Sequence, residues 1–213
     1  MKNIYWLSSS VRFEDQLRYA SAMTLETELC SHRPEHAARS RWIRPLKVIG
    51  PIRPMTDFEW TVYGDVIVSR SVAESLRNVG FSGMQCLPAE LHTSTETPFG
   101  RESLELRING WGGNAPADSG IHEVERCSYC EHKVFSGYSH PERLFDIGGW
   151  DGSDMFLIWP LPRYIMVTGR VRNFILDSKY TGVCLRKLEE LPHVVAGTLT
   201  PGNLRDWFDE DRL

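Results

Sequence analysis

The pair Cys127 and Cys130 is the sharpest chemical motif in the sequence, because two residues separate the two thiols. Thiolates at this spacing hold one tetrahedral zinc ion from a tight turn, and a closed structural site needs two further ligands. Residue type alone leaves several candidates for them, among which the sequence does not choose. These candidates are Cys30, His32, His36, His122, His132 and His140.

A redox role for the same pair is disfavoured by the residues on its C-terminal side. A thioredoxin-like dithiol stands at the start of a helix that comes after a strand. Residues 131–141 instead predict a short extended piece and a turn. A knuckle that binds no metal remains the alternative to zinc. Cys86 and Cys184 fall in short predicted strands, where burial in the core is the ordinary role of a free cysteine.

Other catalytic signatures are missing from the sequence. It contains no G-x-S-x-G elbow, no phosphate-binding GK[ST] loop, no GxGxxG and no HExxH. The carboxylates Asp146, Asp151 and Asp154 do not have the spacing of an EF-hand loop, and a polar turn explains them. We therefore expect a protein that is not an enzyme.

Charge and hydropathy bear on which partners and which cell compartment we expect. The 24 basic and 28 acidic residues give a net charge of −4, which disfavours nucleic acid as a ligand. No apolar run approaches the length of a membrane span, so no membrane association is expected. Residues 1–10 hold only a four-residue apolar stretch, too short for a signal peptide, and the five cysteines are an odd number. We expect a cytoplasmic protein without disulfides.

An internal similarity at an offset of 99 residues organises the rest of the chain, and it aligns residues 66–86 with residues 165–185 without a gap. In each copy a β-rich run leads to a hydroxyl residue that suits a helix N-cap, and apolar residues then recur at helical spacing. A glycine precedes the next short strand. The matched pairs are Val68 and Val167, Ser69 and Thr168, Val72 and Val171, Leu76 and Ile175, Phe81 and Tyr180, Ser82 and Thr181, Gly83 and Gly182.

These patterns predict an α+β fold, a single body built on two strand–helix–strand repeat units at about 65–87 and 164–186, with an inserted CxxC knuckle. Along the chain we expect an N-terminal segment (1–50), a first repeat half (51–120), and the knuckle with the second repeat half (121–213). Together they are expected to form one compact domain.

Candidate partner-binding residues come from two regions. Trp111 and Trp150 lie beside glycines in predicted loops, where large aromatic side chains can anchor an interface. Asp206 and Asp209 belong to an acidic C-terminal stretch that surrounds two aromatic residues and could grip a basic partner.

Taken together, these motifs resemble the double-CXXCG proteins expanded in myxobacteria, over nearly the whole chain from about residue 25. Members of that family look like immunity proteins paired with polymorphic toxins that are delivered between neighbouring cells. The resemblance implies a cytoplasmic protein that binds a cognate toxin stoichiometrically and neutralises it. The segments that carry it are 49–51, 65–76, Gly83, 127–130, 154–156, 163–190 and 199–204.

The chain departs from the family pattern at both knuckles. The second knuckle has Glu131 where the family has glycine, and the first keeps only Cys30, with Arg33 at the place of its second cysteine. His32 or His36 could replace the missing ligand. The expected structural zinc site is therefore Cys127, Cys130, Cys30 and His32. A zinc-ribbon protein that binds nucleic acid, or acts as a regulator, is the alternative function.

Overall fold

The computed structural model describes residues 3–50, 53–95, 97–98, 100, 102–191 and 197–207. The described part is strand-rich and mixed, consistent with the expected α+β class, and holds two α-helices, α1 (Arg70–Val79) and α2 (Gly169–Asp177). Its strands are β1 (Ile4–Ser9), β2 (Arg18–Tyr19), β3 (Leu25–Leu29), β4 (Ala37–Trp42), β5 (Leu46–Ile49), β6 (Phe58–Trp60), β7 (Val66–Ser69), β8 (Met84–His92), β9 (Ser103–Ile108), β10 (Trp111–Asn114), β11 (Glu123–Arg126), β12 (Lys133–Ser136), β13 (Met155–Trp159), β14 (Leu161–Thr168), β15 (Val183–Lys187) and β16 (Thr198–Leu199).

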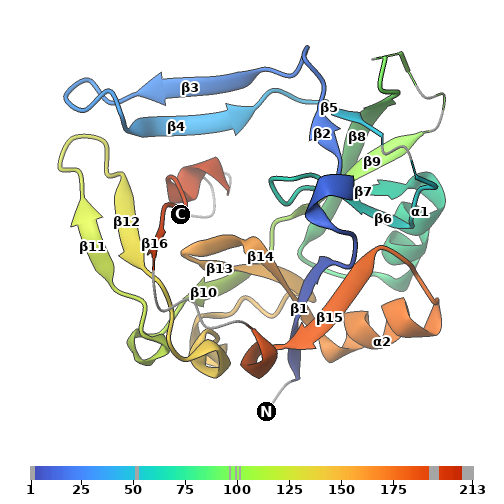
Figure 1. Cartoon of the computed structure of the whole chain (residues 1–213). Helices are drawn as coiled ribbons and strands as arrows, with labels where there is room; N and C mark the ends of the chain where they lie inside the picture. Colours follow the sequence, from blue (N-terminus) through green and yellow to red (C-terminus); the bar gives the residue numbers. More distant parts are fainter. Residues whose placement is uncertain are drawn as a thin grey trace.

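Two sheets form the body of the molecule, and each contains four strands in a corresponding order. The six-stranded sheet runs β2-β5-β8-β9-β7-β6 and the five-stranded sheet runs β10-β13-β14-β1-β15. In the first, β9 lies antiparallel between β7 and β8. In the second, β1 lies antiparallel between β14 and β15, so the N-terminal strand takes the inner position that β9 holds in the other sheet (Figure 1).

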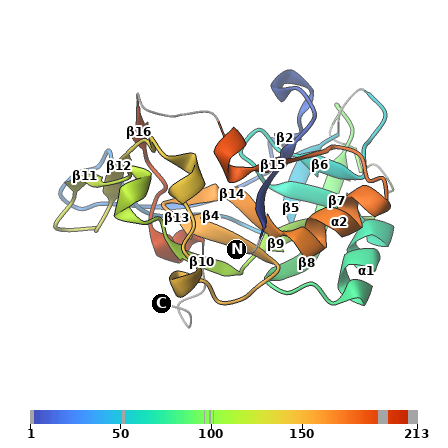
Figure 2. The same ribbon diagram turned by 90° about the horizontal axis from the view of Figure 1, so that it is seen from below.

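Each helix follows a strand directly and buries one apolar stripe. The Ser69 hydroxyl accepts the N–H of Val72 and caps α1, which ends at Gly80 in the left-handed conformation at φ 73°. Thr168 precedes α2, but its hydroxyl donates to Asp154 at 3.1 Å instead of capping the helix. The two helices lie side by side in Figure 2. Both predicted segments therefore run strand, helix, strand.

The main core lies where the two sheets and both helices meet. The five-stranded sheet is covered on both faces, which is why its strand β13 is buried along its whole length. Met155 and Leu157 point into the main core, whereas Phe156 and Ile158 pack in a second cluster with residues of the knuckle segment. A third, smaller cluster lies under β2 and β5.

The loop after α1 docks on the start of β13. The N–H of Met155 donates to the Ser82 carbonyl at 3.1 Å, and the Asp154 carboxylate accepts the Ser82 N–H at 3.2 Å. Gly83, at φ 79°, lies so close that a Cβ there would stand 2.0 Å from the Met155 carbonyl oxygen. Glycine is therefore required at this position.

The loop after α2 makes the same contacts with the start of β6. The N–H of Phe58 donates to the Thr181 carbonyl at 3.1 Å, and the Asp57 carboxylate accepts the Thr181 N–H at 2.8 Å. A Cβ on Gly182 would stand 2.0 Å from the Phe58 carbonyl oxygen. Each helix loop thus holds the other half of the body.

Two hairpins extend from this body and position the candidate site. The strands β3 and β4 form a two-stranded sheet of their own, and β11, β12 and β16 form a three-stranded sheet. The sheets of the body also combine strands from the three segments expected from sequence, since β1 pairs with β14 and β5 pairs with β8. Among the described residues, no helix has the length and apolar character needed to cross a membrane.

The glycine contacts predict a large difference between two substitutions in one loop. Gly80→Ala should destabilise the fold by about 1–2 kcal/mol, because alanine is strained in the left-handed conformation and no atom lies within 4 Å of the added Cβ. Gly83→Ala should cost roughly a further 1–3 kcal/mol, because its Cβ overlaps a backbone carbonyl. Urea unfolding of both variants measures the difference. Equal losses would contradict the proposed close approach.

Candidate metal centre

The hairpin β3–β4 presents Cys30 and His36 side by side at its tip. Leu29 pairs with Ala37 at the end of the ladder, and the N–H of Cys30 then donates to the His36 carbonyl at 3.0 Å. Within the loop, the N–H of His36 donates to the Arg33 carbonyl at 2.8 Å. This tight loop places a thiol and an imidazole on facing positions of one hairpin.

The knuckle is the tip of the hairpin β11–β12. The N–H of Cys127 donates to the His132 carbonyl at 2.8 Å, and the N–H of Glu131 donates to the Cys127 carbonyl at 3.0 Å. The turn closes through Glu131 in the left-handed conformation, at φ 58°. This explains physically why glycine suits the position after a CxxC knuckle, since glycine adopts positive φ without strain.

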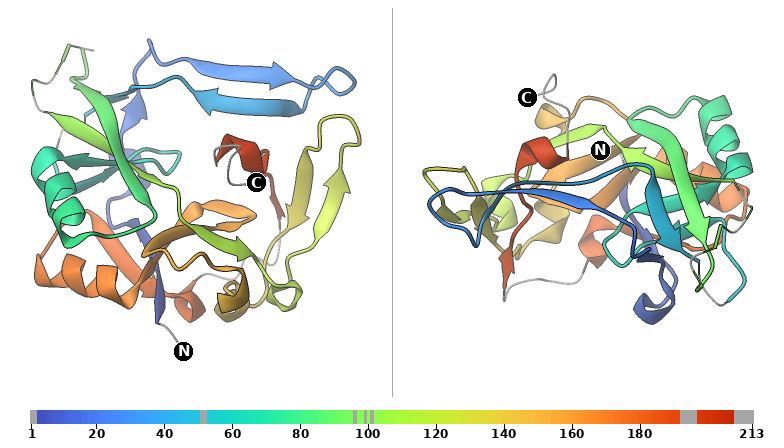
Figure 3. Two further views of the ribbon diagram at one scale, coloured as in Figure 1. Left: turned by 180° about the vertical axis from the view of Figure 1, so that it is seen from behind. Right: turned by 90° about the horizontal axis from the view of Figure 1, so that it is seen from above.

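The two hairpin tips meet and bring three cysteines together, and the ribbon views show the tips next to each other at one side of the molecule (Figure 3). The Sγ atoms of Cys30, Cys127 and Cys130 all lie within 4.8 Å of one another. The Cys30 and Cys127 Sγ atoms are 3.9 Å apart. A tetrahedral ion with zinc–sulfur bonds of about 2.3 Å requires sulfur atoms about 3.8 Å apart, so the thiol cluster of these three residues fits zinc.

His36 is the imidazole in contact with the thiol cluster. Its Nδ1 atom lies 4.0 Å from the Cys130 Sγ atom, and tetrahedral zinc bonded to sulfur and nitrogen requires a separation of about 3.6 Å. The residue is 8% exposed, so it is already desolvated beside the thiols. With His36 as the fourth ligand, the site would have three sulfurs and one nitrogen, which is a common set for structural zinc.

A second imidazole lies directly behind the first. The His132 ring stacks on the His36 ring with centroids 4.5 Å apart. Burial and the neighbouring His36 lower the pKa of His132, so its ring is neutral at pH 7. Its Nδ1 atom is buried and has no hydrogen-bond partner among the described residues. The stack holds the His36 ring in place against the cluster.

The knuckle backbone prepares one thiol for a metal. The amide groups of Cys130 and Tyr129 donate to the Cys127 sulfur and lower the pKa of Cys127 to about 6, whereas burial raises the pKa of Cys130. Metal ligands must be deprotonated, and a thiolate at Cys127 is available at neutral pH before an ion arrives. The chemistry of the donor set thus favours a soft divalent ion such as zinc.

His32, expected from sequence as the fourth ligand, lies beside the cluster. Its ring packs on Tyr129 with centroids 3.6 Å apart and an interplanar angle of 30°. The close group of ligand atoms holds the three cysteines and neither histidine, and His36 is favoured because its Nδ1 atom lies 4.0 Å from the Cys130 Sγ atom. Its neighbour Arg33 pairs with Glu125 across the two hairpins. Sequence reasoning left both histidines open, and the hairpin register that favours His36 is a property of the fold.

The candidate partner-binding residues have structural contacts of their own. Trp111 is half-buried and packs against two core clusters. The indole N–H of Trp150 donates to the Ser153 carbonyl at 3.1 Å. Asp206 accepts the N–H of Ser40 at 3.2 Å and so joins the C-terminal segment to β4. Asp209 lies outside the described residues. Partner contact through these residues stays a prediction.

Comparison with known proteins leaves the site to be judged from its own residues. No protein-family model matches the chain, and no curated protein is similar to it.

The geometry predicts about one zinc ion per chain, held at the junction of the two hairpins. Cys127→Ser and Cys30→Ser should each remove most of the bound zinc and lower the melting temperature, because a structural ion contributes folding free energy. Mass spectrometry of metal content and calorimetry measure both effects. Cys184→Ser is the matched control and should keep its zinc, since Cys184 is outside the cluster.

Substituting His36 and His32 in turn distinguishes the ligand that the structure favours from the ligand expected from sequence. His36→Ala should weaken zinc binding by about 10- to 100-fold or more in a competition with a chromogenic chelator. His32→Ala should leave the affinity within about twofold, because its ring stacks on Tyr129 instead. The opposite ranking would restore His32 as the ligand.

The strained turn predicts a stabilising substitution. Glu131→Gly should raise the free energy of unfolding of the zinc-loaded protein by about 1 kcal/mol, because it relieves a left-handed non-glycine residue. The exposed ion pair that Glu131 forms with Arg126 offsets little of this gain. Arg126→Ala removes that pair alone and should change stability by less than about 0.5 kcal/mol. A loss of stability in Glu131→Gly would count against the strain argument.

Proposed function

We propose that this chain is an immunity protein that binds a cognate bacterial toxin one to one and neutralises it, with zinc in a structural role. The observation that carries the proposal is the junction of the two hairpins at the thiol cluster. An ion bound there would hold the exposed apolar side chains of the two hairpins in one arrangement. A protein that must occupy a partner stoichiometrically gains affinity from such preorganisation.

The ligand set supports a structural role for the metal. Cys30, Cys127, Cys130 and His36 would hold the ion, and four protein ligands complete a tetrahedral zinc. A catalytic zinc needs an open position for water or substrate. The ion would therefore supply folding free energy at the hairpin junction.

The surface around the junction has the composition of a protein-binding site. Among the described residues, several large apolar side chains are exposed on these two hairpins. Leu29 at the end of β3 is 59% exposed, and Val124 on β11 and Tyr129 in the knuckle are 57% and 64% exposed. Apolar and aromatic side chains that gather on rigid protruding elements are typical of protein interfaces.

We also infer that the two halves of the body derive from one repeated unit. The corresponding strand orders, the two strand–helix–strand segments and the reciprocal contacts of Gly83 and Gly182 support this inference. Because β1 precedes its half in sequence and β9 follows its own, the two copies would be related by a circular permutation.

Co-expression tests the proposal. A tagged copy of this chain is purified from its native host, and the gene of a one-to-one partner is then expressed in a neutral bacterium. The partner should arrest growth alone and be harmless together with this chain. A partner that is not toxic, or bound nucleic acid in its place, would overturn the proposal.

Matched variants test whether the two hairpins form the toxin-binding surface. The double variant Leu29→Glu with Val124→Glu should weaken toxin binding by at least about tenfold while keeping its zinc, because buried charges oppose an apolar interface. Ile147→Glu is the control, since Ile147 is 60% exposed and lies outside both hairpins. Equal binding by the two proteins in calorimetry would exclude the hairpins as the toxin-binding surface.

A further inference from the structure

The two hairpin tips at the thiol cluster are built alike. In each, a cysteine directly follows the first strand and donates its N–H to the carbonyl of the histidine that directly precedes the second strand. The pairs are Cys30 with His36 at 3.0 Å and Cys127 with His132 at 2.8 Å. The two cysteines therefore occupy equivalent positions in their hairpins, and the two histidines do so as well.

These equivalent residues face each other across the junction. The His36 and His132 rings stack with centroids 4.5 Å apart, and the Sγ atoms of Cys30 and Cys127 lie 3.9 Å apart. The two thiols belong to residues 97 positions apart in the chain. Both cysteines are buried, at 4% and 3% exposed. Cys30 and Cys127 therefore form a direct sulfur contact between two hairpins that are distant in sequence.

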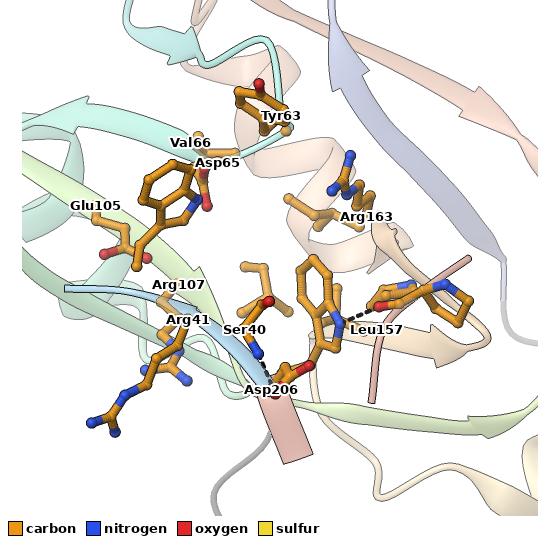
Figure 4. Close-up of a pocket in the computed structure, with 18 of the residues that line it drawn as sticks. Ser40, Arg41, Tyr63, Asp65, Val66, Glu105, Arg107, Leu157, Arg163 and Asp206 are labelled. Atoms are coloured by element: carbon orange, nitrogen blue, oxygen red, sulfur yellow. Dashed lines mark hydrogen bonds between the residues drawn. The ribbon is translucent and has the colours of Figure 1, made fainter. Parts of the chain in front are cut away.

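Contacts without sulfur hold the two hairpins in this arrangement. The Asp206 carboxylate accepts the Ser40 N–H at 3.2 Å and so fixes β4 to the C-terminal segment (Figure 4). At the tips, Arg33 of one hairpin forms an ion pair with Glu125 of the other. Neither contact uses an atom that would bind an ion, so both also act in the metal-free protein, where they keep the two thiols close.

We propose that Cys30 and Cys127 are an oxidation site, at which a peroxide joins the two hairpins through a disulfide bond. Hydrogen peroxide first oxidises one thiol to a sulfenic acid, as its O–O bond breaks and one water leaves. The second thiol then attacks this sulfur, the S–S bond forms, and the hydroxyl leaves with the proton of the second thiol as another water. The two sulfur atoms lose two electrons in all, and the peroxide gains them. A disulfide requires sulfur atoms about 2.05 Å apart, so rotation of the two side chains must bring them roughly 2 Å closer.

The geometry favours this pair over the pair within the CxxC knuckle. Cys127 and Cys130 lie in one tight turn, which is closed by the hydrogen bond from the Glu131 N–H to the Cys127 carbonyl. A bond between them would constrain only this turn, whereas a bond between Cys30 and Cys127 spans 97 residues and constrains the unfolded chain more. Because the three sulfur atoms lie within 4.8 Å of one another, thiol–disulfide exchange lets the more stable pair accumulate.

The disulfide and a bound ion are alternative ways to close the junction. The disulfide uses two of the three sulfur atoms, and Cys130 with His36 would be too few ligands for a tetrahedral zinc site. Oxidation would therefore release the ion while the two hairpins stay joined by a covalent bond. This inference goes beyond toxin neutralisation and does not depend on it, since it requires only that the two thiols lie in contact.

Peptide mapping of the purified full-length protein tests the proposal. The protein is treated with hydrogen peroxide in a buffer with EDTA, which takes up any ion that leaves, and the remaining thiols are then alkylated. Two of the five thiols should be lost. Digestion without reductant should release one linked peptide pair that contains Cys30 and Cys127 and that dithiothreitol separates. Fragment-ion spectra identify the linked residue, because Cys127 and Cys130 fall in the same tryptic peptide.

Matched variants distinguish the possible pairings. Cys130→Ser should keep the linked pair, and Cys30→Ser should abolish it. Cys184→Ser is the control and should react as the parent does, since Cys184 lies outside the cluster. Thiols lost without a linked pair, a disulfide that includes Cys130, or no reaction at all would each overturn the proposal. The parent protein alone decides among these results if a variant does not fold.

Discussion

The position of the hairpin β3–β4 depends on its contacts with the body at its base and with β11–β12 at its tip. A two-stranded ribbon is at best marginally stable in water, and every residue of β3 is exposed. Its base is held where Trp42 packs on Tyr19, with ring centroids 4.2 Å apart, and its tip reaches β11–β12 at the thiol cluster. Between base and tip, Asp206 and Asn203 of the C-terminal segment hold β4 through hydrogen bonds with Ser40 and Ala38. The exposed apolar side chains at the hairpin tips depend on that junction for their position.

The body and the junction are held by different kinds of interaction. The two halves of the body meet through apolar burial and through backbone groups that approach as closely as glycine allows, as at Gly83 and Gly182. The hairpins meet through the thiols, the ion pair of Arg33 with Glu125, and two ring contacts, His36 with His132 and His32 with Tyr129. An ion bound at the thiol cluster would therefore stabilise the hairpin junction more than the core.

The sequence predicted those structural features that are set by residues close together in the chain. The spacing of Cys127 and Cys130, the helices and the glycines that follow them were accessible because each is set within about ten residues. The residues that join this knuckle in the cluster could not be predicted in this way. Cys30 and Cys127 are 97 residues apart, and the resemblance, not the spacing, pointed to Cys30. The choice of His36 over His32 depends on the register of β3 and β4, which a polar, exposed hairpin does not encode as an alternating pattern.

The inner position of β1 sets the order in which the chain can fold as it is synthesised. The first sheet unites β6, β7, β8 and β9, which leave the ribosome in close succession, so that half can form early. β1 emerges before all of them, yet it pairs only with β14 and β15. At 5–20 residues per second, about 160 further residues take on the order of 10–30 s to appear. During that interval both edges of an apolar strand stay unpaired, so the nascent chain has a long window in which a chaperone, or another nascent copy, can reach it.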